Sequence, residues 1–362
     1  MTILGIETSC DETAAAVIQA NVKNKSIKIL SNIVSSSLNL HSKTGGIIPE
    51  IAAREQVKYI IPVIKKALMS TLGVDTQTID AIAVTVGPGL IGSLLVGVET
   101  AKTLSYLWNK PIVPVNHLVG HIYANFIQTT DERRQTTDSR KTENTESLSS
   151  VFSPLIFPAI ALIVSGGHTD LVIMKNHQQI KWLGGTRDDA AGEALDKIGR
   201  LLGLPYPGGP SIEKTAQNGD IKAFNFPRPM LDSDDFDFSF SGLKTAVFKK
   251  AKAIKQFNNI TIANICASVQ QAIIDVLITK TLKAAQKYKA KSILLGGGVA
   301  ANQKLRNGLK LNAKRYTLYA KIFAPQKSLC TDNAAMIATA AFFNYKPIPW
   351  NRITANPELY FD

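Results

Sequence analysis

Residues 158–174 read PAIALIVSGGHTDLVIM, and this stretch decides the fold. Two apolar runs flank a short turn of serine, glycine, histidine and threonine, a pattern that predicts two strands joined by a tight turn. Residues 1–17, MTILGIETSCDETAAAV, show the same order of apolar strand, polar turn and apolar strand. A plan that occurs twice in one chain predicts an internal duplication, so we expect two lobes built alike.

The segments between and after these hairpins alternate between strand-like and helix-like patterns. Short apolar runs predict strands, and apolar residues at helical spacing predict helices. Such alternation is typical of α/β proteins, whose ligand loops lie at the carboxyl ends of strands. The expected strands include 28–36, 80–86 and 111–115; the expected helices are 51–72, 92–107 and 261–288, with others inside 184–216, 237–255 and 292–309 and after Cys330; 41–50 is expected to be a loop, and the Gly/Pro-rich part of 184–216 a turn.

Length and composition bound the protein class. The chain has 362 residues, of which 45% are hydrophobic and 19% charged, as in an ordinary soluble protein with room for two domains. The net charge of +13 favours an acidic partner such as nucleic acid, a nucleotide or a membrane surface, although solubility alone explains it equally well. We expect an N-terminal lobe at 1–128, a polar insertion or linker at 129–150, a nucleotide-binding lobe at 151–332, and a helix with a tail at 333–362 that packs back onto the first lobe.

No segment predicts a membrane protein or a secreted one. Residues 81–98, AIAVTVGPGLIGSLLVGV, are nearly long enough to span a bilayer, but Gly87, Pro88 and Gly89 interrupt them, which favours strand, loop and helix. The start has no basic region and reaches Glu7 early, unlike a signal peptide. The three cysteines are far apart and form no CxxC pair, so neither a disulfide framework nor a zinc cluster is indicated. We therefore expect a cytoplasmic location.

Three loops of small residues follow apolar strands: GIETSCDET, LIVSGGHTD and ILLGGGVAAN. Glycine backbones let amide groups approach phosphate oxygens, and serine and threonine hydroxyls add donors. Neither a P-loop nor a GxGxxG motif is present, and a single loop of this kind is commonly just a tight turn. Three in one chain predict a nucleotide site.

Residues 111–126, PIVPVNHLVGHIYANF, contain two of the five histidines. If Asn116 caps a helix, His117 and His121 lie one turn apart on one face and can share a metal ion, with Gly120 leaving room for a ligand. Two unrelated helix histidines are the alternative. Two ligands are too few for a tight site, so a third must come from elsewhere, and Asp332 in CTDN is a candidate.

The residue after His117 argues against a peptidase. A zinc protease of the HExxH type carries its glutamate next to the first histidine, where it activates water. This chain has Leu118 at that place. A metal held here has no adjacent general base, and it is better suited to gripping a substrate oxygen or a phosphate than to hydrolysing a peptide bond.

The motifs together resemble those of the TsaD family, the tRNA adenosine threonylcarbamoyltransferases. The resemblance covers nearly the whole chain, in the order of the family. It implies the actin-like, Hsp70-like and sugar-kinase-like fold, an α/β fold with two RNase H-like lobes around a nucleotide-binding cleft, which agrees with the duplicated hairpin. The stretches that carry it are GIETSCDET, HSKTGGIIPEIAARE, VGPGLIGSLLVG, NHLVGHIYA, LIVSGGHT, DDAAGEALDKIGRLLGLPYPGGP, FSFSGLKTA, GGGVAANQKLR and CTDNAAMIA.

The resemblance also implies a reaction and a set of partners. The donor would be threonylcarbamoyl-AMP, which a partner enzyme makes from threonine, bicarbonate and ATP. The acceptor would be the exocyclic amine of the adenosine 3′ to the anticodon, in tRNAs reading codons that start with A, and AMP would leave. Bacterial partners would be similar to TsaB, a catalytically inert relative, and TsaE, an ATPase.

Site residues follow from the same resemblance. His117, His121 and Asp332 match the metal ligands, for an ion described as iron or zinc, with the Ser165 hydroxyl expected near it. Asp11 and Glu12 are candidates for proton handling or orientation, the alternative being carboxylates that cap the turn. The residues that match donor-binding positions are Ile163, Val164, Ser165, Gly166, Gly167, Asp196, Gly209, Glu213 and Asn302.

Two departures from the family and three rival functions remain open. Gln56 stands where many members have histidine, and the 129–150 insertion is not a standard part of the pattern. The rivals are a small-molecule kinase of the same fold using ATP and magnesium, a non-catalytic paralogue that binds partner proteins, and the peptidase. Some basic residues are expected to follow the tRNA backbone and most to be solvated: Lys244, Lys249, Lys250, Lys252, Lys255, those from Lys280 to Lys291, Lys304, Arg306, Lys310, Lys314 and Arg315.

Overall fold

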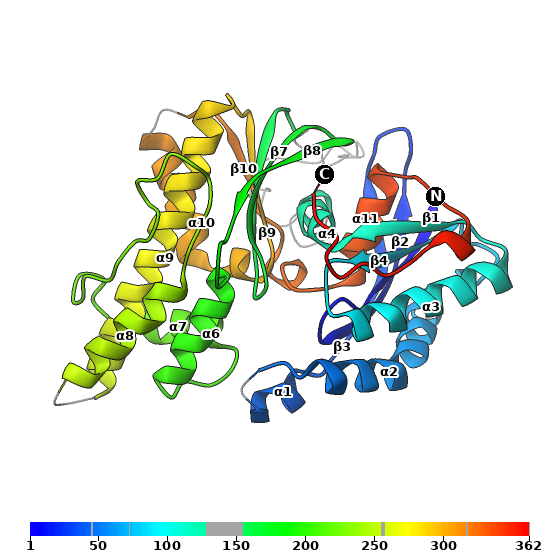
Figure 1. Ribbon diagram of the computed structural model, residues 1–362. Coiled ribbons are helices and arrows are strands. Elements are labelled where there is room, and N and C mark those ends of the chain that lie inside the picture. The colour runs from blue at the N-terminus through cyan, green and yellow to red at the C-terminus, as the bar shows by residue number, and fades with distance from the viewer. Residues whose placement is uncertain (45, 72, 128–154, 255–257, 316–317, 362) are drawn as a thin grey trace, which may run out of the picture.

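A computed structural model describes most of the chain, and Figure 1 shows two sheets with helices between them and on their outer sides. The predicted linker at 129–150 lies outside the described residues, and so does Lys255. The predicted domain boundaries stay predictions. The described residues are 1–44, 46–71, 73–127, 155–254, 258–315 and 318–361.

The first sheet has the strand order β3-β2-β1-β4-β5. The hairpin β1–β2 is antiparallel, β3 continues it antiparallel, β4 adds a parallel strand beside β1, and β5 adds a parallel strand beside β4. β1, β2, β4 and β5 are largely buried, whereas the edge strand β3 is mostly half-buried or exposed. The bounds are β1 Thr2–Glu7, β2 Glu12–Ala20, β3 Ile27–Ser36, β4 Ala81–Gly87 and β5 Ile112–Asn116.

The second sheet repeats the first. Its order is β10-β9-β6-β7-β8, with an antiparallel β6–β7–β8 meander, the parallel strand β9 beside β6 and the parallel strand β10 beside β9. The role of β1 is taken by β6, and that of β4 by β9. The predicted duplication is therefore confirmed at the level of strand pairing. The bounds are β6 Ala159–Val164, β7 Thr169–Asn176, β8 Gln179–Gly185, β9 Ser292–Gly296 and β10 Lys321–Phe323.

The outer helices cover one face of each sheet. In the first lobe α2 and α3 pack on β2 and β4, and in the second α9 packs on β6 and gathers α7, α8 and α10 around it. Two expectations hold only in part, because α1 and α2 take both ends of the predicted loop at 41–50 and leave 46–48 non-helical, and α7 begins at Gly208 inside the predicted Gly/Pro-rich turn. The bounds are α1 Leu38–Thr44, α2 Pro49–Met69, α3 Ile91–Trp108, α6 Ala191–Leu201, α7 Gly208–Ala216, α8 Ser241–Ala253, α9 Asn259–Lys287 and α10 Gln303–Arg315.

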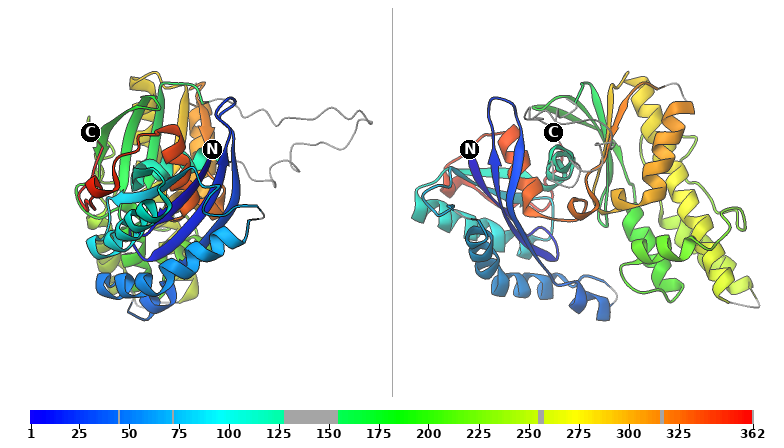
Figure 2. Two further views of the ribbon diagram at one scale, coloured as in Figure 1. Left: turned by 90° about the vertical axis from the view of Figure 1, so that its right-hand side faces the viewer. Right: turned by 180° about the vertical axis from the view of Figure 1, so that it is seen from behind.

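Two helices cross between the lobes. Helix α4 (His117–Tyr123) follows the first sheet but contacts β6 and β9 of the second. Helix α11 (Ala334–Phe343) follows the second sheet but packs on β1, β2 and β4 of the first, and it also packs on α4. One apolar core contains the inner faces of both sheets and both helices, which lie between the sheets in Figure 2. This exchange brings segments that are far apart in the sequence together.

One helix among the described residues, α9, is long and apolar enough to cross a membrane. Of its most apolar window 67% is buried inside the structure, where it forms much of the core of the second lobe. The helix therefore serves as a core element. The predicted break inside 81–98 is confirmed, since β4 ends at Gly87 and α3 begins at Ile91.

Candidate metal centre

Asn116 places the two histidines. Its Oδ1 accepts hydrogen bonds from the amides of Leu118 at 2.8 Å and Val119 at 3.3 Å, so it caps α4 as predicted. His117 is the first residue of the helix and His121 follows one turn later. Their rings meet edge to face, with centroids 4.6 Å apart.

Gly120 has a different role from the predicted one. A Cβ at this position would lie 2.6 Å from Cδ1 of Ile337 on α11. The glycine therefore permits the close approach of α4 to α11 and leaves no extra room for a ligand. The correction matters because this approach brings the start of α11 to the histidines.

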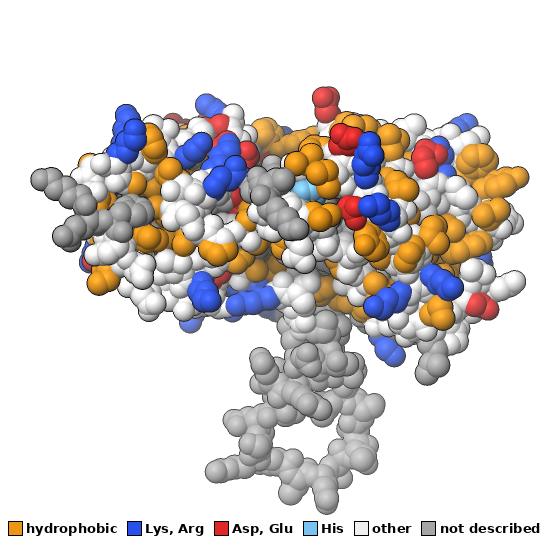
Figure 3. Space-filling view, turned by 90° about the horizontal axis from the view of Figure 1, so that it is seen from below, with side chains coloured by type: hydrophobic (Ala, Val, Ile, Leu, Met, Phe, Trp, Pro, Cys, Tyr) orange, Lys and Arg blue, Asp and Glu red, His pale blue; other side chains and the backbone are white. Residues whose placement is uncertain are grey.

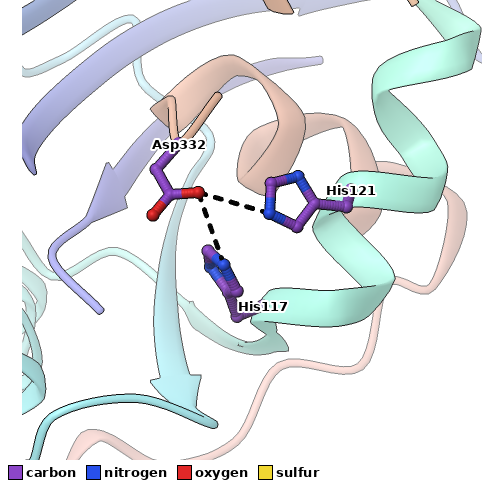
Figure 4. Close-up of side chains that lie close together, drawn as sticks. All are labelled: His117, His121 and Asp332. Carbon is purple, nitrogen blue, oxygen red and sulfur yellow. Dashed lines mark ion pairs between the residues drawn. The ribbon is translucent and has the colours of Figure 1, made fainter. Parts of the chain in front are cut away.

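Asp332 completes a cluster of three. The side chain of the next residue, Asn333, caps α11 by accepting from the amide of Met336 at 3.0 Å. The Oδ1 atom of Asp332 lies 3.2 Å from His121 Nε2 and 3.5 Å from His117 Nε2, as Figure 4 shows. One possible ligand atom from each residue lies within 4.8 Å of the others.

The donor set fits a divalent transition metal ion. His121 is 1% exposed; its Nδ1 has no hydrogen-bond partner among the described residues, and its Nε2 has only the Asp332 carboxylate, 3.2 Å away. A buried polar group without a partner is unfavourable, and a bound cation would satisfy it. Two imidazoles and a carboxylate suit iron(II) and zinc alike and do not choose between them.

A carboxylate and a hydroxyl orient the first histidine. The Nδ1 atom of His117 lies 3.1 Å from both Glu7 Oε2 and Ser9 Oγ. Thr85 in turn donates its hydroxyl to the same glutamate oxygen at 2.5 Å. These contacts hold the ring through Nδ1, so that Nε2 faces Asp332 and would be the atom that holds a metal ion. The sequence analysis missed Glu7 and Ser9, although a glutamate that ends an apolar strand is an unusual residue for a core.

Several ionisable side chains lie close together in this small buried volume. Burial favours the neutral form of His117, but Glu7 and Asp332 outweigh it and raise its pKa to about 9. Burial dominates at His121 and lowers its pKa. For Asp332, burial is outweighed by His117 and His121, which hold its pKa well below the usual range. A metal ion entering the site would displace the proton from His117.

Gln56 holds the turn that follows β1. Its Nε2 lies 3.3 Å from the carbonyl oxygen of Thr8, 3.1 Å from that of Cys10 and 2.9 Å from that of Glu12, and the residue is 1% exposed. A single amide group thus clamps three carbonyls of the TSCDE turn. Glutamine at this position therefore has a defined structural role in this chain.

The two acidic residues of that turn, Asp11 and Glu12, are in side-chain contact with each other. Along β2, Ala14 and Ala16 belong to the core beneath α11, whereas Ala15 belongs to the core beneath α2. Alternation therefore directs Glu12 toward the space between the lobes. Asp11 lines a cavity of about 290 Å³ beside α2 together with Ser36, whose hydroxyl donates to Glu12 Oε1 at 3.5 Å. Burial first, and then the charges of Asp332 and Asp11, raise the pKa of Glu12 well above its usual range.

The predicted donor-binding strip ends β6 and forms the following turn. Ile163 and Val164 are buried in the sheet. Ser165 closes the turn, because its amide donates to the His168 carbonyl at 2.8 Å and its hydroxyl accepts from the His168 amide at 3.2 Å. At Gly166 and Gly167 nothing lies within 4 Å of a Cβ position. The turn therefore offers an open backbone surface.

Asp196 and Gly209 meet at the start of α7. The Oδ1 atom of Asp196 accepts from the Gly208 amide at 2.7 Å, and burial raises the pKa of the carboxyl. This contact explains why PGGPSIEKTA is helical although it reads as a turn.

Glu213 and Asn302 meet at the start of α10. Glu213 accepts from the Gln303 amide at 2.8 Å, and Asn302 accepts from the Leu305 amide at 3.0 Å. Both side chains cap the helix, so the loop GGGVAAN is held firmly against α7. Their predicted contact with a nucleotide stays a prediction.

The glycine loop after β9 contacts both α4, which carries the two histidines, and the end of β6, which belongs to the predicted donor-binding strip. A Cβ at Gly296 would lie 2.9 Å from the carbonyl oxygen of His121. Gly297 has φ +87°, which favours glycine, and it packs on the Val164 carbonyl. The two predicted sets of residues are therefore neighbours across the lobes.

Two further residues face this space and were missed. Burial, and then the positive charges of His117 and His121, lower the pKa of His168 to about 4. Burial, and then Asp196 and the acidic turn of the first lobe, raise the pKa of Tyr206 to about 12. Only their position between the lobes marks them, and no local sequence pattern does so.

The distribution of basic residues can be followed on one face of the molecule. On the face shown in Figure 3, lysine and arginine side chains are spread over both halves. Lys280, predicted to be one of the solvated or RNA-facing lysines, is 0% exposed and donates to Ser233 at 2.7 Å and to Asp235. The expectation was wrong for this residue because its ammonium group holds a loop in the interior.

The fold matches a known architecture. The crystal structure of full-length HypF in the phosphate- and nucleotide-bound form has a TM-score of 0.56 and 11% sequence identity, over 95% of this chain and 46% of that one. The structure of HypF from T. kodakarensis gives a TM-score of 0.58, over 95% of this chain and 47% of the other. This chain thus spans about half of either protein. The expected α/β fold with two actin-like lobes is confirmed.

The sequence comparisons identify the family. The family model for TsaD, tRNA N6-adenosine threonylcarbamoyltransferase, matches residues 28–143 and 146–339. The enzyme of that name from Moorella thermoacetica is 46% identical, over 95% of this chain and 92% of its own length. The one from Staphylococcus haemolyticus is 45% identical, over 99% and 94%. This chain therefore belongs to the TsaD family of tRNA N6-adenosine threonylcarbamoyltransferases.

Proposed function

We propose that this chain transfers the threonylcarbamoyl group from threonylcarbamoyl-AMP to the N6 amine of the adenosine 3′ to the anticodon in tRNAs reading codons that start with A. The amine nitrogen forms a bond to the carbamoyl carbon, the bond from that carbon to the phosphate oxygen breaks, and AMP leaves with the electron pair. The amine loses one proton. The observation that carries the proposal is the convergence of His117, His121 and Asp332 in a chain of this family.

The three ligands would hold one iron(II) or zinc ion beside the donor. Such an ion supplies a Lewis acid for a phosphate or carbamoyl oxygen, on which negative charge develops during the transfer. The open backbone of Gly166 and Gly167 would receive the donor next to it. Asp196 and Glu213 offer carboxylates suited to ribose hydroxyls. An aromatic amine is a weak nucleophile, so the fixed position of both substrates should contribute much of the rate.

Glu12 is the proposed proton acceptor. It faces the space between the lobes, and burial together with the charge of Asp332 raises its pKa above the usual range of a carboxyl group, which favours its binding a proton. Asp11 is the preceding residue of the turn, and its charge and its hydrogen bond to Glu12 add to that shift. The role of Asp11 in the proposal is therefore electrostatic.

The reaction requires partners that make the donor and regulate the enzyme. We include tRNA as the acceptor and proteins similar to TsaB and TsaE as assembly partners. The cytoplasmic location expected from the sequence stays a prediction. A small-molecule kinase is less well supported, because magnesium prefers oxygen ligands and this cluster offers two imidazoles. A non-catalytic paralogue is less well supported because the cluster is intact.

The test is a transfer assay. Purified protein, the partner proteins, ATP, bicarbonate, labelled threonine and an unmodified tRNA would be combined, and label in tRNA measured. We expect wild-type protein to label the tRNA and His121→Ala to lose most of that activity. No labelling by wild type, where a known system labels the same tRNA, would overturn the function. Equal labelling by both proteins would overturn the metal role alone.

A further inference from the structure

The C-terminal segment crosses from one lobe to the other. It is tied to the first lobe where β4 ends, because the Asn356 amide donates to the Val86 carbonyl at 2.7 Å and the Gly89 amide donates to the Pro357 carbonyl at 3.3 Å. Gly87 also packs on the Asn356 carbonyl so closely that a Cβ could not fit. These contacts direct the residues after Pro357 toward α4.

Tyr360 then contacts both halves of the site. Its carbonyl oxygen accepts from Nδ2 of Asn116 at 3.4 Å, and Asn116 is the residue that caps α4 in front of His117. Its hydroxyl donates to Oδ1 of Asp170 on β7. Tyr360 therefore links Asn116, the N-cap of α4, to strand β7 of the opposite lobe.

Asp170 lies directly behind the donor-binding strip. It is the register partner of Ile163 in the β6–β7 pair, and it is 1% exposed. Its Oδ2 atom has no hydrogen-bond partner among the described residues and lies 3.7 Å from Nδ1 of His168, the last residue of the open turn. A buried carboxylate of this kind depends on its few donors for its position.

Two donors share the other carboxylate oxygen of Asp170. They are the Tyr360 hydroxyl and Nε1 of Trp182, which lies 3.1 Å away on the neighbouring strand β8. The two rings also meet edge to face, with centroids 6.2 Å apart. Trp182 belongs to the same lobe as Asp170, whereas Tyr360 arrives from the first lobe. Of the two donors, only Tyr360 connects Asp170 to α4.

We infer that Tyr360 is a positioning residue for the transfer reaction. Through its contacts with Asp170 and Asn116, it holds the proposed donor-binding turn at 165–168 in a fixed position relative to α4. The inference rests on the proposed function for the identity of the reaction. The charge-assisted bond to Asp170 is of the strong kind. Its loss should let the turn shift relative to the metal ligands, which lowers the rate more than it weakens binding of the donor.

The test compares Tyr360→Phe with Trp182→Phe. Each removes one donor to the same oxygen and keeps an aromatic ring, but only the first cuts the link between the lobes. We expect Tyr360→Phe to lower kcat about 10- to 100-fold with the KM for threonylcarbamoyl-AMP within about twofold, and Trp182→Phe to change kcat by less than about threefold. Asp170→Asn, which cuts the link from the other side, should reproduce the effect of Tyr360→Phe.

Amide hydrogen exchange makes the test independent of activity. Exchange of the amides in 165–169 and α4 should accelerate in Tyr360→Phe and stay as in wild type in Trp182→Phe. Equal losses in the two variants, or no loss in Tyr360→Phe, would overturn the inference while wild type remains active. An inactive wild type would instead count against the proposed function, and the exchange result would still decide whether Tyr360 couples the lobes.

Discussion

Oδ1 of Asp332 lies 3.2 Å from Nε2 of His121, although the histidine follows the first sheet and the aspartate follows the second. The contact exists because α4 and α11 each cross to the opposite lobe. A metal ion at this point would therefore bind both halves of the molecule at once. Binding of the ion should stabilise the packing of the lobes as well as supply chemistry.

Removing Asp332 should abolish tight metal binding. Asp332→Ala leaves two imidazoles, and we expect the affinity for iron(II) or zinc to fall by more than the roughly 10- to 100-fold typical of changes outside the ligand set. Elemental analysis of protein prepared without chelators checks this. The control is Asp234→Ala, which removes an exposed aspartate outside the cluster. Equal metal content in the two variants would contradict the ligand assignment.

Weakening the support of His117 should have a smaller effect. Glu7→Gln keeps the shape of the side chain but removes the charge that faces Nδ1 at 3.1 Å. We expect a loss of metal affinity of about 10- to 100-fold, with the stoichiometry unchanged at saturating metal. Competition with a coloured chelator measures the affinity. An unchanged affinity would show that Glu7 does not act on the metal site.

The local part of the site could be predicted from the sequence, and the rest depends on tertiary packing. The spacing of His117 and His121 and the cap at Asn116 are helix rules, so both were foreseen. The crossing of α4 and α11 has no local signature, and Gly120 was misinterpreted because its partner, Ile337, comes from the other half. The helix α7 was missed because a distant carboxylate, Asp196, caps it.

The acidic turn offers a test of the two carboxyl groups. Glu12→Gln should lower kcat about 100-fold or more, because general acid–base groups contribute factors of about 10² to 10⁴. Asp11→Asn should have a smaller effect, since its side chain lies in the cavity beside α2. Single-turnover transfer to tRNA separates this step from product release. The reverse order of effects would assign proton handling to Asp11.

Gln56 should be required for the stability of the same turn. Gln56→Leu removes the amide that reaches three buried carbonyls, and we expect a loss of about 1–3 kcal/mol in the free energy of unfolding. Urea unfolding followed by circular dichroism measures it. Gln56→His restores a ring donor at the position and should recover part of the loss. A leucine variant as stable as wild type would contradict the clamp.

The pH dependence of stability should have a contribution from Asp188. Its carboxylate accepts from the Phe240 amide at 2.8 Å and from the hydroxyls of Ser239 and Ser241, which tie the start of α8 to the loop before α6. Burial opposes ionisation, but these hydrogen bonds outweigh it and lower the pKa of Asp188. A lowered folded pKa gives stability that is present above the ordinary carboxyl pKa and is lost as the pH falls through the folded value.

Asp188→Asn should therefore destabilise the protein at pH 7 by roughly 1 kcal/mol, a value kept small because the group is exposed to solvent. At an acidic pH, where the wild-type carboxylate takes up its proton, the difference between the two proteins should shrink. Urea unfolding at both pH values measures it, with Asp234→Asn as the matched control. A constant difference at both pH values would mean that the side chain acts through its shape and not through its charge.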